Sequence, residues 1–224
     1  GSGETHFGYI FGAADCYNND DYVPESLKEV IITGGTIIGQ RAFYGCRNLI
    51  SITIPKSVTS IDYDQNGSMR GGAFFGCISL ENITVEAGNA VYHSSGNCII
   101  KTNSKELIAG CKTSIIPDDG SVTRIGWQAF EGCSGLTSIT IPNSVASIDF
   151  MAFEGCSGLT SVTIGNGVTS IGQSAFRGCS GLTSITFKGT KQQWKDISKG
   201  PYWNYDIGEY TVTCTDGVLD EYGS

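Results

Sequence analysis

Calcium coordination is the first chemistry that the sequence suggests. Asp62, Asp64, Asn66 and Gly67 match the first half of a Ca²⁺-binding loop of the type D-x-D-x-N-G, in which oxygens at alternate positions surround a hard cation. The second half does not match, because Ala73 stands where such a loop should supply a bidentate glutamate. The stretch fits a solvated, glycine-rich loop better. We therefore predict no metal site and no cofactor, and Asp62, Asp64 and Asn66 remain weak Ca²⁺ candidates.

Nucleophilic catalysis requires a base beside the nucleophile, and the sequence offers no obvious pair of this kind. The two histidines, His6 and His93, are far apart in the chain. Five cysteines occupy one repeated position directly after Ala-Phe-x-Gly, which indicates buried thiols that act as small apolar fillers. These are Cys46, Cys77, Cys133, Cys156 and Cys179. We expect no catalytic residues and no enzymatic activity.

The other four cysteines lie outside this repeated position, at Cys16, Cys98, Cys111 and Cys214. The total of nine is odd, so not all of them can pair within one chain. A bridge between Cys98 and Cys111 across a hairpin is the one pairing worth testing. The disulfide state and the redox compartment stay open.

These residues are positioned by an internal repeat. The stretch from Gly132 to Ile148 returns 23 residues later as Gly155 to Ile171, and its Cys-Ser-Gly-Leu-Thr-Ser opening returns again at Cys179. Looser copies precede it. A fixed period of this length is typical of a solenoid, in which each unit buries its apolar face against its neighbours. We therefore predict a single β-rich solenoid domain of about seven coils.

Composition excludes several classes of partner. The net charge is −8 with only 14 Lys and Arg residues, which argues against nucleic acid and anionic membrane surfaces. Apolar runs are too short for a membrane-spanning helix, so we expect no membrane insertion. The chain begins at Gly1 without Met, and a targeting segment would therefore lie outside this sequence.

Breaks in the repeat define the expected organisation. Residues 1–26 carry no repeat and are predicted to form an N-terminal cap, 27–187 the solenoid, and 188–224 a C-terminal cap. The solenoid contains an inserted loop at 62–72 and an inserted hairpin at 91–116. A capping box formed by Thr190 and Gln193 predicts a short helix in the C-terminal cap.

Alternation within each repeat places isoleucines inside and short hydroxyl side chains outside. The outward residues form two parallel ladders: Thr53, Thr84, Ser138, Thr140, Ser161, Thr163, Ser184 and Thr186. Such a flat, uncharged face of low side-chain entropy suits a broad protein or glycan contact. The alternative is purely structural, because Thr favours strands and keeps a sheet soluble.

The aromatic stretch from Tyr202 to Tyr205 is the second candidate surface. Trp203 and Tyr205 could form a platform for a sugar ring. The structural alternative is that these rings plug the open core of the last coil.

The motif Leu-Thr-Ser-Ile-Thr-Ile-Pro-x-Ser-Val-x-Ser-Ile-x-x-x-Ala-Phe-x-Gly-Cys, as in Leu136 to Cys156, resembles the BspA-type leucine-rich repeat of bacterial surface proteins. The resemblance covers roughly residues 27–187. It implies a right-handed solenoid, classed by convention as α/β, in a protein at the cell surface or secreted. It also implies binding of host or matrix proteins and no catalytic residues.

The function expected from the sequence is therefore a non-enzymatic, extracellular protein-binding or adhesion module. A carbohydrate-binding module that uses the C-terminal aromatic residues is one alternative, with a glycan as the partner. A structural spacer that projects another domain from the surface is the other. The partner's identity and the oligomeric state are left open by the sequence.

Overall fold

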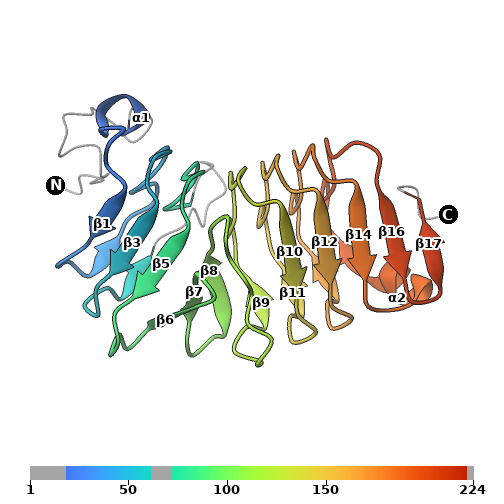
Figure 1. Ribbon diagram of the computed structural model, residues 1–224. Coiled ribbons are helices and arrows are strands. Elements are labelled where there is room, and N and C mark those ends of the chain that lie inside the picture. Colours follow the sequence, from blue (N-terminus) through green and yellow to red (C-terminus); the bar gives the residue numbers. More distant parts are fainter. Residues whose placement is uncertain (1–18, 62–71, 221–224) are drawn as a thin grey trace.

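The computed structural model describes residues 19–61 and 72–220 of the 224-residue chain (Figure 1). They form an elongated, β-rich solenoid of about eight turns. We take each turn to begin at the motif position that Leu136 occupies in the copy from Leu136 to Cys156. From the first to the seventh turn these positions are Leu27, Leu49, Leu80, Cys111, Leu136, Leu159 and Leu182. In the eighth turn the register of β16 puts Glu209 at this position, and the next residue, Tyr210, is buried.

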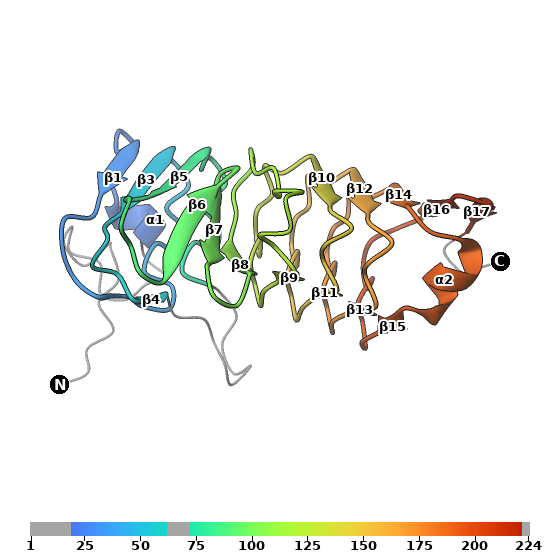
Figure 2. The ribbon, with the colours of Figure 1, turned by 90° about the horizontal axis from the view of Figure 1, so that it is seen from below.

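One row of strands lines the face that we call the ladder face (Figures 1 and 2). Its first sheet is parallel, in the order β1 (Glu29–Ile31), β3 (Ser51–Ile54) and β5 (Asn82–Val85). Its second sheet runs in the order β10 (Ser138–Ile141), β12 (Ser161–Ile164), β14 (Ser184–Phe187), β16 (Thr211–Cys214) and β17 (Gly217–Leu219). The pairing is parallel except between β16 and β17.

A second row of strands lies on the opposite side of the solenoid, with two residues in each strand except β6, β7 and β8, which have four (Figure 2). There β2 (Ile37–Ile38) pairs with β4 (Ser60–Ile61). A seven-stranded sheet follows in the order β15 (Ser198–Lys199), β13 (Ser170–Ile171), β11 (Ser147–Ile148), β9 (Arg124–Ile125), β8 (Glu106–Ala109), β7 (Cys98–Lys101) and β6 (Tyr92–Ser95).

Identical repeat positions stack in columns between the two rows. Phenylalanine rings form an aromatic spine in which Phe130 and Phe153 are 4.9 Å apart, and Phe153 and Phe176 are 5.0 Å apart, in nearly parallel planes. The cysteine column lies beside it, and three of its thiols donate to the phenylalanine carbonyl of the preceding turn: Cys77 to Phe43 O, Cys156 to Phe130 O and Cys179 to Phe153 O, at 3.0–3.1 Å. The predicted core positions are therefore confirmed.

The inserted segment differs from the hairpin predicted for 91–116. It is a three-stranded antiparallel meander, β6–β7–β8, because Gly96 and Asn97 both take positive φ values and make a tight turn within the first predicted strand. The predicted turn at residues 102–105 is present between β7 and β8. Residues 111–117 do not continue the meander. They form the fourth turn of the solenoid instead.

The third turn is also shortened. Gly110 takes the place that phenylalanine holds elsewhere, since its N–H donates to Ala129 O just as the Phe130 N–H donates to Ala152 O. A Cβ on Gly110 would lie 2.0 Å from the Phe130 ring, so the spine is interrupted here. The buried apolar residues accordingly fall into two clusters, one centred on Ile52, Ile54 and Leu80, the other on Ile139, Leu159 and Ile185.

The ends of the chain carry the helices. α1 (Asn19–Tyr22) precedes the first turn, and α2 (Lys191–Asp196) follows β14. The predicted capping box is confirmed, because Thr190 Oγ1 accepts from the Gln193 N–H while Gln193 Oε1 accepts from the Thr190 N–H. The solenoid has one turn more than the seven predicted, because β16 pairs in register with β14 and continues the ladder face.

Candidate binding surface

The predicted hydroxyl ladders are present on the ladder face. In the second sheet, Ser138, Ser161, Ser184 and Thr211 are paired in one column, and Thr140, Thr163, Thr186 and Thr213 in the next. In the first sheet, Ser51 pairs with Asn82 and Thr53 with Thr84. All of these side chains are exposed or half-buried, whereas the residues between them are buried.

Backbone pairing holds these columns at fixed spacing. Parallel strands lie about 4.8 Å apart, and alternate residues of one strand about 7 Å apart. Threonine side chains at the edges of the strands add further links, since Thr160 Oγ1 donates to Thr137 O at 3.0 Å and Thr183 Oγ1 to Thr160 O at 3.4 Å. The second sheet therefore presents a regular, rigid array of hydroxyl groups.

The array is close to neutral. Its outward side chains in turns five to seven carry no charge between Thr137 and Thr140, between Thr160 and Thr163, or between Thr183 and Thr186. In the preceding turns, Lys112 Nζ lies 2.8 Å from Glu81 Oε1, and the exposed Glu29 pairs with Ser51 in the first sheet. Although the chain is acidic overall, the second sheet between β10 and β14 offers a partner hydrogen-bonding groups rather than an electrostatic field.

The fourth turn interrupts the hydroxyl columns, and sequence analysis missed it as a repeat. Residues 111, 114 and 116 are buried, as residues 136, 139 and 141 are, with Cys111 in the leucine position and Pro117 in the proline position. Ile115 follows Cys111 by four residues, as Thr140 follows Leu136, and 75% of its surface is exposed. The signal was present in the sequence as Ile116-Pro117, which matches Ile141-Pro142, but the altered spacing of the meander concealed it.

Two other exposed apolar residues lie at the ends of the threonine column. Ile31 pairs with Thr53 and is 59% exposed, and Val218 pairs with Thr213 and is 53% exposed. The ladder face is therefore not uniformly polar.

The C-terminal aromatic residues divide into a packed and an exposed part. Trp203 is half-buried and makes edge contacts with Phe176, Trp194 and Tyr210 at 6.3, 6.1 and 6.4 Å, so that its ring covers the end of the aromatic spine. Tyr205 is 55% exposed and meets the exposed Tyr202 ring at 6.0 Å and 88°. The two tyrosine rings are perpendicular to each other rather than coplanar, and we call the corner between them the C-terminal notch.

Charged groups border this notch. The Arg177 guanidinium lies 5.7 Å from the centre of the Tyr205 ring, in the geometry of a cation–π contact, and 3.5 Å from Glu154 Oε1.

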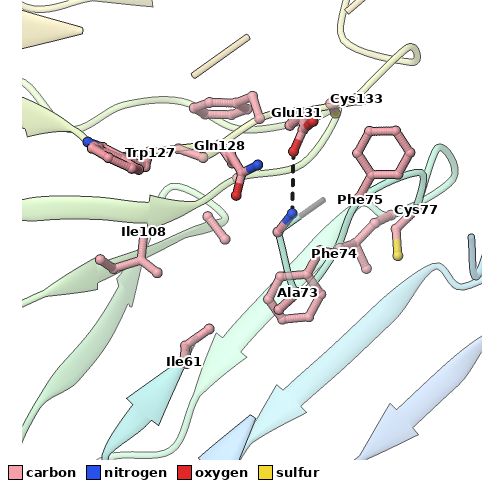
Figure 3. Close-up of a pocket in the computed structure, with 16 residues that line it drawn as sticks. Ile61, Ala73, Phe74, Phe75, Cys77, Ile108, Trp127, Gln128, Glu131 and Cys133 are labelled. Atoms are coloured by element: carbon pink, nitrogen blue, oxygen red, sulfur yellow. Dashed lines mark hydrogen bonds between the residues drawn. The ribbon is translucent and has the colours of Figure 1, made fainter. Parts of the chain in front are cut away.

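The interruption of the solenoid leaves a small hollow at the corner where the third turn is shortened (Figure 3). Phe74 and Phe75 line one side, and Trp127, Gln128 and Glu131 the other. Its volume of about 30 Å³ has room for a water molecule or two. Glu131 accepts a hydrogen bond from the Gly72 N–H at 3.3 Å, and the buried Gln128 Oε1 has no protein partner.

All eight described cysteines are buried free thiols. Burial raises the pKa of Cys133 to about 12, and that of Cys98 to about 12 as well. Cys98 packs in the C-terminal cluster and Cys111 in the N-terminal one, and each is a free thiol, so the bridge considered for this pair is absent from the structure.

The remaining predictions about chemistry can be placed as follows. Asp62, Asp64 and Asn66, with almost all of the inserted loop 62–72 and residues 1–18 of the N-terminal cap, lie outside the described residues. Within the described ones, no three His, Cys, Asp or Glu side chains gather closely enough to hold a metal ion. His93 Nδ1 lies 2.9 Å from Thr102 Oγ1.

No helix of residues 19–61 and 72–220 is long and apolar enough to cross a bilayer.

Comparison with known proteins places this solenoid among bacterial leucine-rich repeat proteins. A leucine-rich repeat protein from Eubacterium ventriosum has a crystal structure that superposes with a TM-score of 0.62 at 25% identity, covering 84% of this chain and 48% of the other. A leucine-rich cell surface protein from Faecalibacterium prausnitzii gives 0.44 at 22% identity, over 78% of this chain and 63% of the other. The pneumococcal vaccine antigen PcpA gives 0.46 at 18% identity, over 75% and 45%.

The chain thus spans about half the length of the Eubacterium protein. No curated protein matches it. The family model of the BspA-type leucine-rich repeat region matches six copies, at residues 21–90, 36–118 and 101–222. The chain therefore belongs to the BspA-type leucine-rich repeat family.

Proposed function

We propose that this chain is a non-enzymatic protein-binding module of a bacterial surface protein, and that it binds host or matrix proteins through the ladder face. The observation that carries the proposal is the register of the hydroxyl columns, which pairs Thr140, Thr163 and Thr186 side by side on a rigid, uncharged sheet. Membership of a family of bacterial surface proteins supports an extracellular location.

Rigidity is what makes such a face suited to recognition. Threonine and serine side chains have few rotamers to lose on binding, and strands bonded on both sides lose little backbone freedom. The affinity would then come from the area of contact and from shape, with hydrogen bonds that fix the partner's orientation. No reactive group is needed for this activity.

The test is binding of the purified chain to a panel of immobilised extracellular-matrix and serum proteins. A triple lysine variant at Thr140, Thr163 and Thr186 should lose binding to every partner that the wild-type chain captures, because three ammonium groups would have to be desolvated at the contact. All three side chains point outward, but paired lysines repel each other, so its melting temperature should fall slightly and by about as much as that of the control. The matched control is Ser147→Lys with Ser170→Lys in β11 and β13, on the opposite side. If the triple variant binds as the wild type does, the ladder face is not the contact surface.

Carbohydrate binding at the C-terminal notch is the second candidate. Exposure of Tyr202 and Tyr205 beside Arg177 favours it, because aromatic rings and guanidinium groups are frequent in sugar sites. Tyr205→Ala should then abolish binding on a glycan array while the triple lysine variant retains it. A glycan profile that Tyr205→Ala leaves unchanged would exclude the notch. Trp203 is a poor position for this test because its ring packs on the spine.

A further inference from the structure

The sixth turn of the solenoid carries an Asn-Gly pair at an exposed corner. Asn166 and Gly167 are the central residues of a β-turn between β12 and β13, which the Val168 N–H closes by donating to Gly165 O at 3.3 Å. Asn166 is exposed and Gly167 is half-buried. Asparagine is chemically labile before glycine, because a residue without a side chain leaves its own main-chain nitrogen unshielded and its backbone free to approach the asparagine carboxamide.

Packing between the turns requires this glycine. A Cβ at position 167 would lie 1.9 Å from Asn143 O, a main-chain atom of the preceding turn. A main-chain carbonyl cannot move aside without shifting the whole of that turn. The residue after Asn166 must therefore be glycine, and the labile pair is fixed by the way in which the turns stack.

The fifth turn offers an internal comparison. Asn143 holds the same place there as Asn166 does in the sixth turn, but Ser144 follows it. Asn143 Oδ1 accepts a hydrogen bond from the Asn166 N–H at 3.1 Å, which holds this carboxamide in place. The Ser144 hydroxyl donates to Val122 O at 2.8 Å and fastens the turn to the one before it. The amide of the fifth turn is thus tethered and is followed by a residue that has a side chain.

No such tether reaches Asn166. Its carboxamide forms no hydrogen bond with any residue of 19–61 or 72–220, and neither does the Gly167 N–H. In the seventh turn the Lys188 N–H donates to Ile164 O instead of to this amide. The carboxamide carbon of Asn166 and the nitrogen next to it in the chain are therefore both unengaged.

We propose that Asn166 is a modification site, at which the folded protein converts spontaneously to aspartate and isoaspartate. The Gly167 nitrogen attacks Asn166 Cγ and forms a new C–N bond, the Cγ–Nδ2 bond breaks, and the proton of the Gly167 nitrogen leaves with Nδ2 as ammonia. Water then opens the resulting succinimide at either carbonyl and gives isoaspartate or aspartate. Water is the only co-reactant, and the inference is independent of what the ladder face binds.

The two products affect the solenoid differently. Aspartate keeps the main chain unchanged and adds one negative charge just beyond the end of β12, at the border of the ladder face. Isoaspartate lengthens the main chain by one methylene, at the point where Gly167 packs against Asn143 O. We expect isoaspartate alone to loosen the contact between the fifth and sixth turns.

The test is incubation of the purified full chain at physiological temperature and mildly alkaline pH, followed by tryptic digestion and mass spectrometry. Residues 125–177 form one tryptic peptide, because no lysine or arginine lies between Arg124 and Arg177. Fragment ions of this peptide report Asn143 and Asn166 separately. Asn166 should convert faster than Asn143 by about tenfold or more, because glycine leaves the attacking nitrogen unshielded.

Two variants serve as controls. Asn166→Gln keeps an amide at this position but would have to close a larger ring, so conversion there should be lost. Ser144→Gly gives both turns an Asn-Gly pair, and Asn143 should still convert more slowly because its Oδ1 is tethered. Asn66 also precedes a glycine, but it lies outside the described residues and in another tryptic peptide, so it does not affect the measurement.

Two results would overturn the proposal. The first is an Asn166 that stays intact in the folded chain while it converts in the urea-unfolded chain, because the folded turn would then protect it. The second is equal conversion of Asn143 and Asn166 in Ser144→Gly, because the structure around Asn166 would then play no part.

Discussion

Replacement of Phe153 by leucine tests whether the aromatic spine stabilises the solenoid beyond simple burial. Phe153 is fully buried and its ring lies between Phe130 at 4.9 Å and Phe176 at 5.0 Å, with interplanar angles of 9° and 3°. An aromatic pair contributes about 0.5–1.5 kcal/mol beyond its area, so two pairs amount to roughly 1–3 kcal/mol. The change of shape adds up to about 1.5 kcal/mol. We expect the free energy of unfolding to fall by about 2–4 kcal/mol.

Double-mutant cycles separate ring stacking from burial. Urea unfolding followed by far-ultraviolet circular dichroism gives the free energy for each leucine variant and for the pairs. The cycle for Phe130 and Phe153, which are in contact, should show a coupling of about 0.5–1.5 kcal/mol. Phe130 and Phe176 lie on opposite sides of Phe153 and share it as a partner, so their cycle should show a smaller coupling than that of Phe130 and Phe153. Equal coupling in both cycles would refute stacking as the source of the stabilisation.

Two further outcomes are expected, one on pH and one on the meander tip. Buried Cys133 and Cys98 have pKa values raised from the ordinary 9.0 to about 12, so the folded state keeps protons that the unfolded chain releases. Their contribution to stability should be complete below pH 9 and decrease between pH 9 and 12, by up to about 1.4 kcal/mol per pH unit for each thiol. Urea unfolding of the wild type and of Cys133→Ala at several pH values measures this decrease. An identical dependence of the free energy of unfolding on pH in both proteins would contradict the prediction. Gly96→Ala should destabilise the protein by about 2 kcal/mol or more, because φ is +56° and the new Cβ would lie 1.9 Å from Ile115 O. Gly88→Ala, at φ +88° with no atom within 4 Å, should cost less in the same melting experiment, and an equal cost would show that the close approach is unimportant.

The repeat predicted most of the fold because each of its positions has one structural role. Buried positions such as Ile139 and Phe153, and the outward direction of Thr140, follow from alternation and from a period of 23 residues. The capping box of α2 was equally readable, because Thr190 and Gln193 satisfy each other's backbone across a fixed spacing.

What could not be predicted lies where the period changes. A turn at Gly96–Asn97 divides a stretch that alternates like one strand, and only the paired positive φ values reveal it. Gly110 in place of a spine phenylalanine shortened the third turn and shifted the fourth out of the expected register. The alternating pattern therefore predicts a hairpin strand around Ile115. In the structure Ile115 lies outside the meander and is the most exposed large apolar residue in the described part of the chain.

The similar copies in turns five and six, which the first half of turn seven continues, also make the molecule adjustable in length. Each of these turns bonds to its neighbours through the same positions, as Thr169 Oγ1 does to Ala146 O and Thr183 Oγ1 to Thr160 O, 23 residues apart. Gain or loss of one such unit in the gene would leave every contact type intact. It would move the C-terminal tyrosines relative to Ile115 by one strand spacing, about 4.8 Å. Evolution can therefore change the distance between the two exposed surfaces in uniform steps without redesigning either.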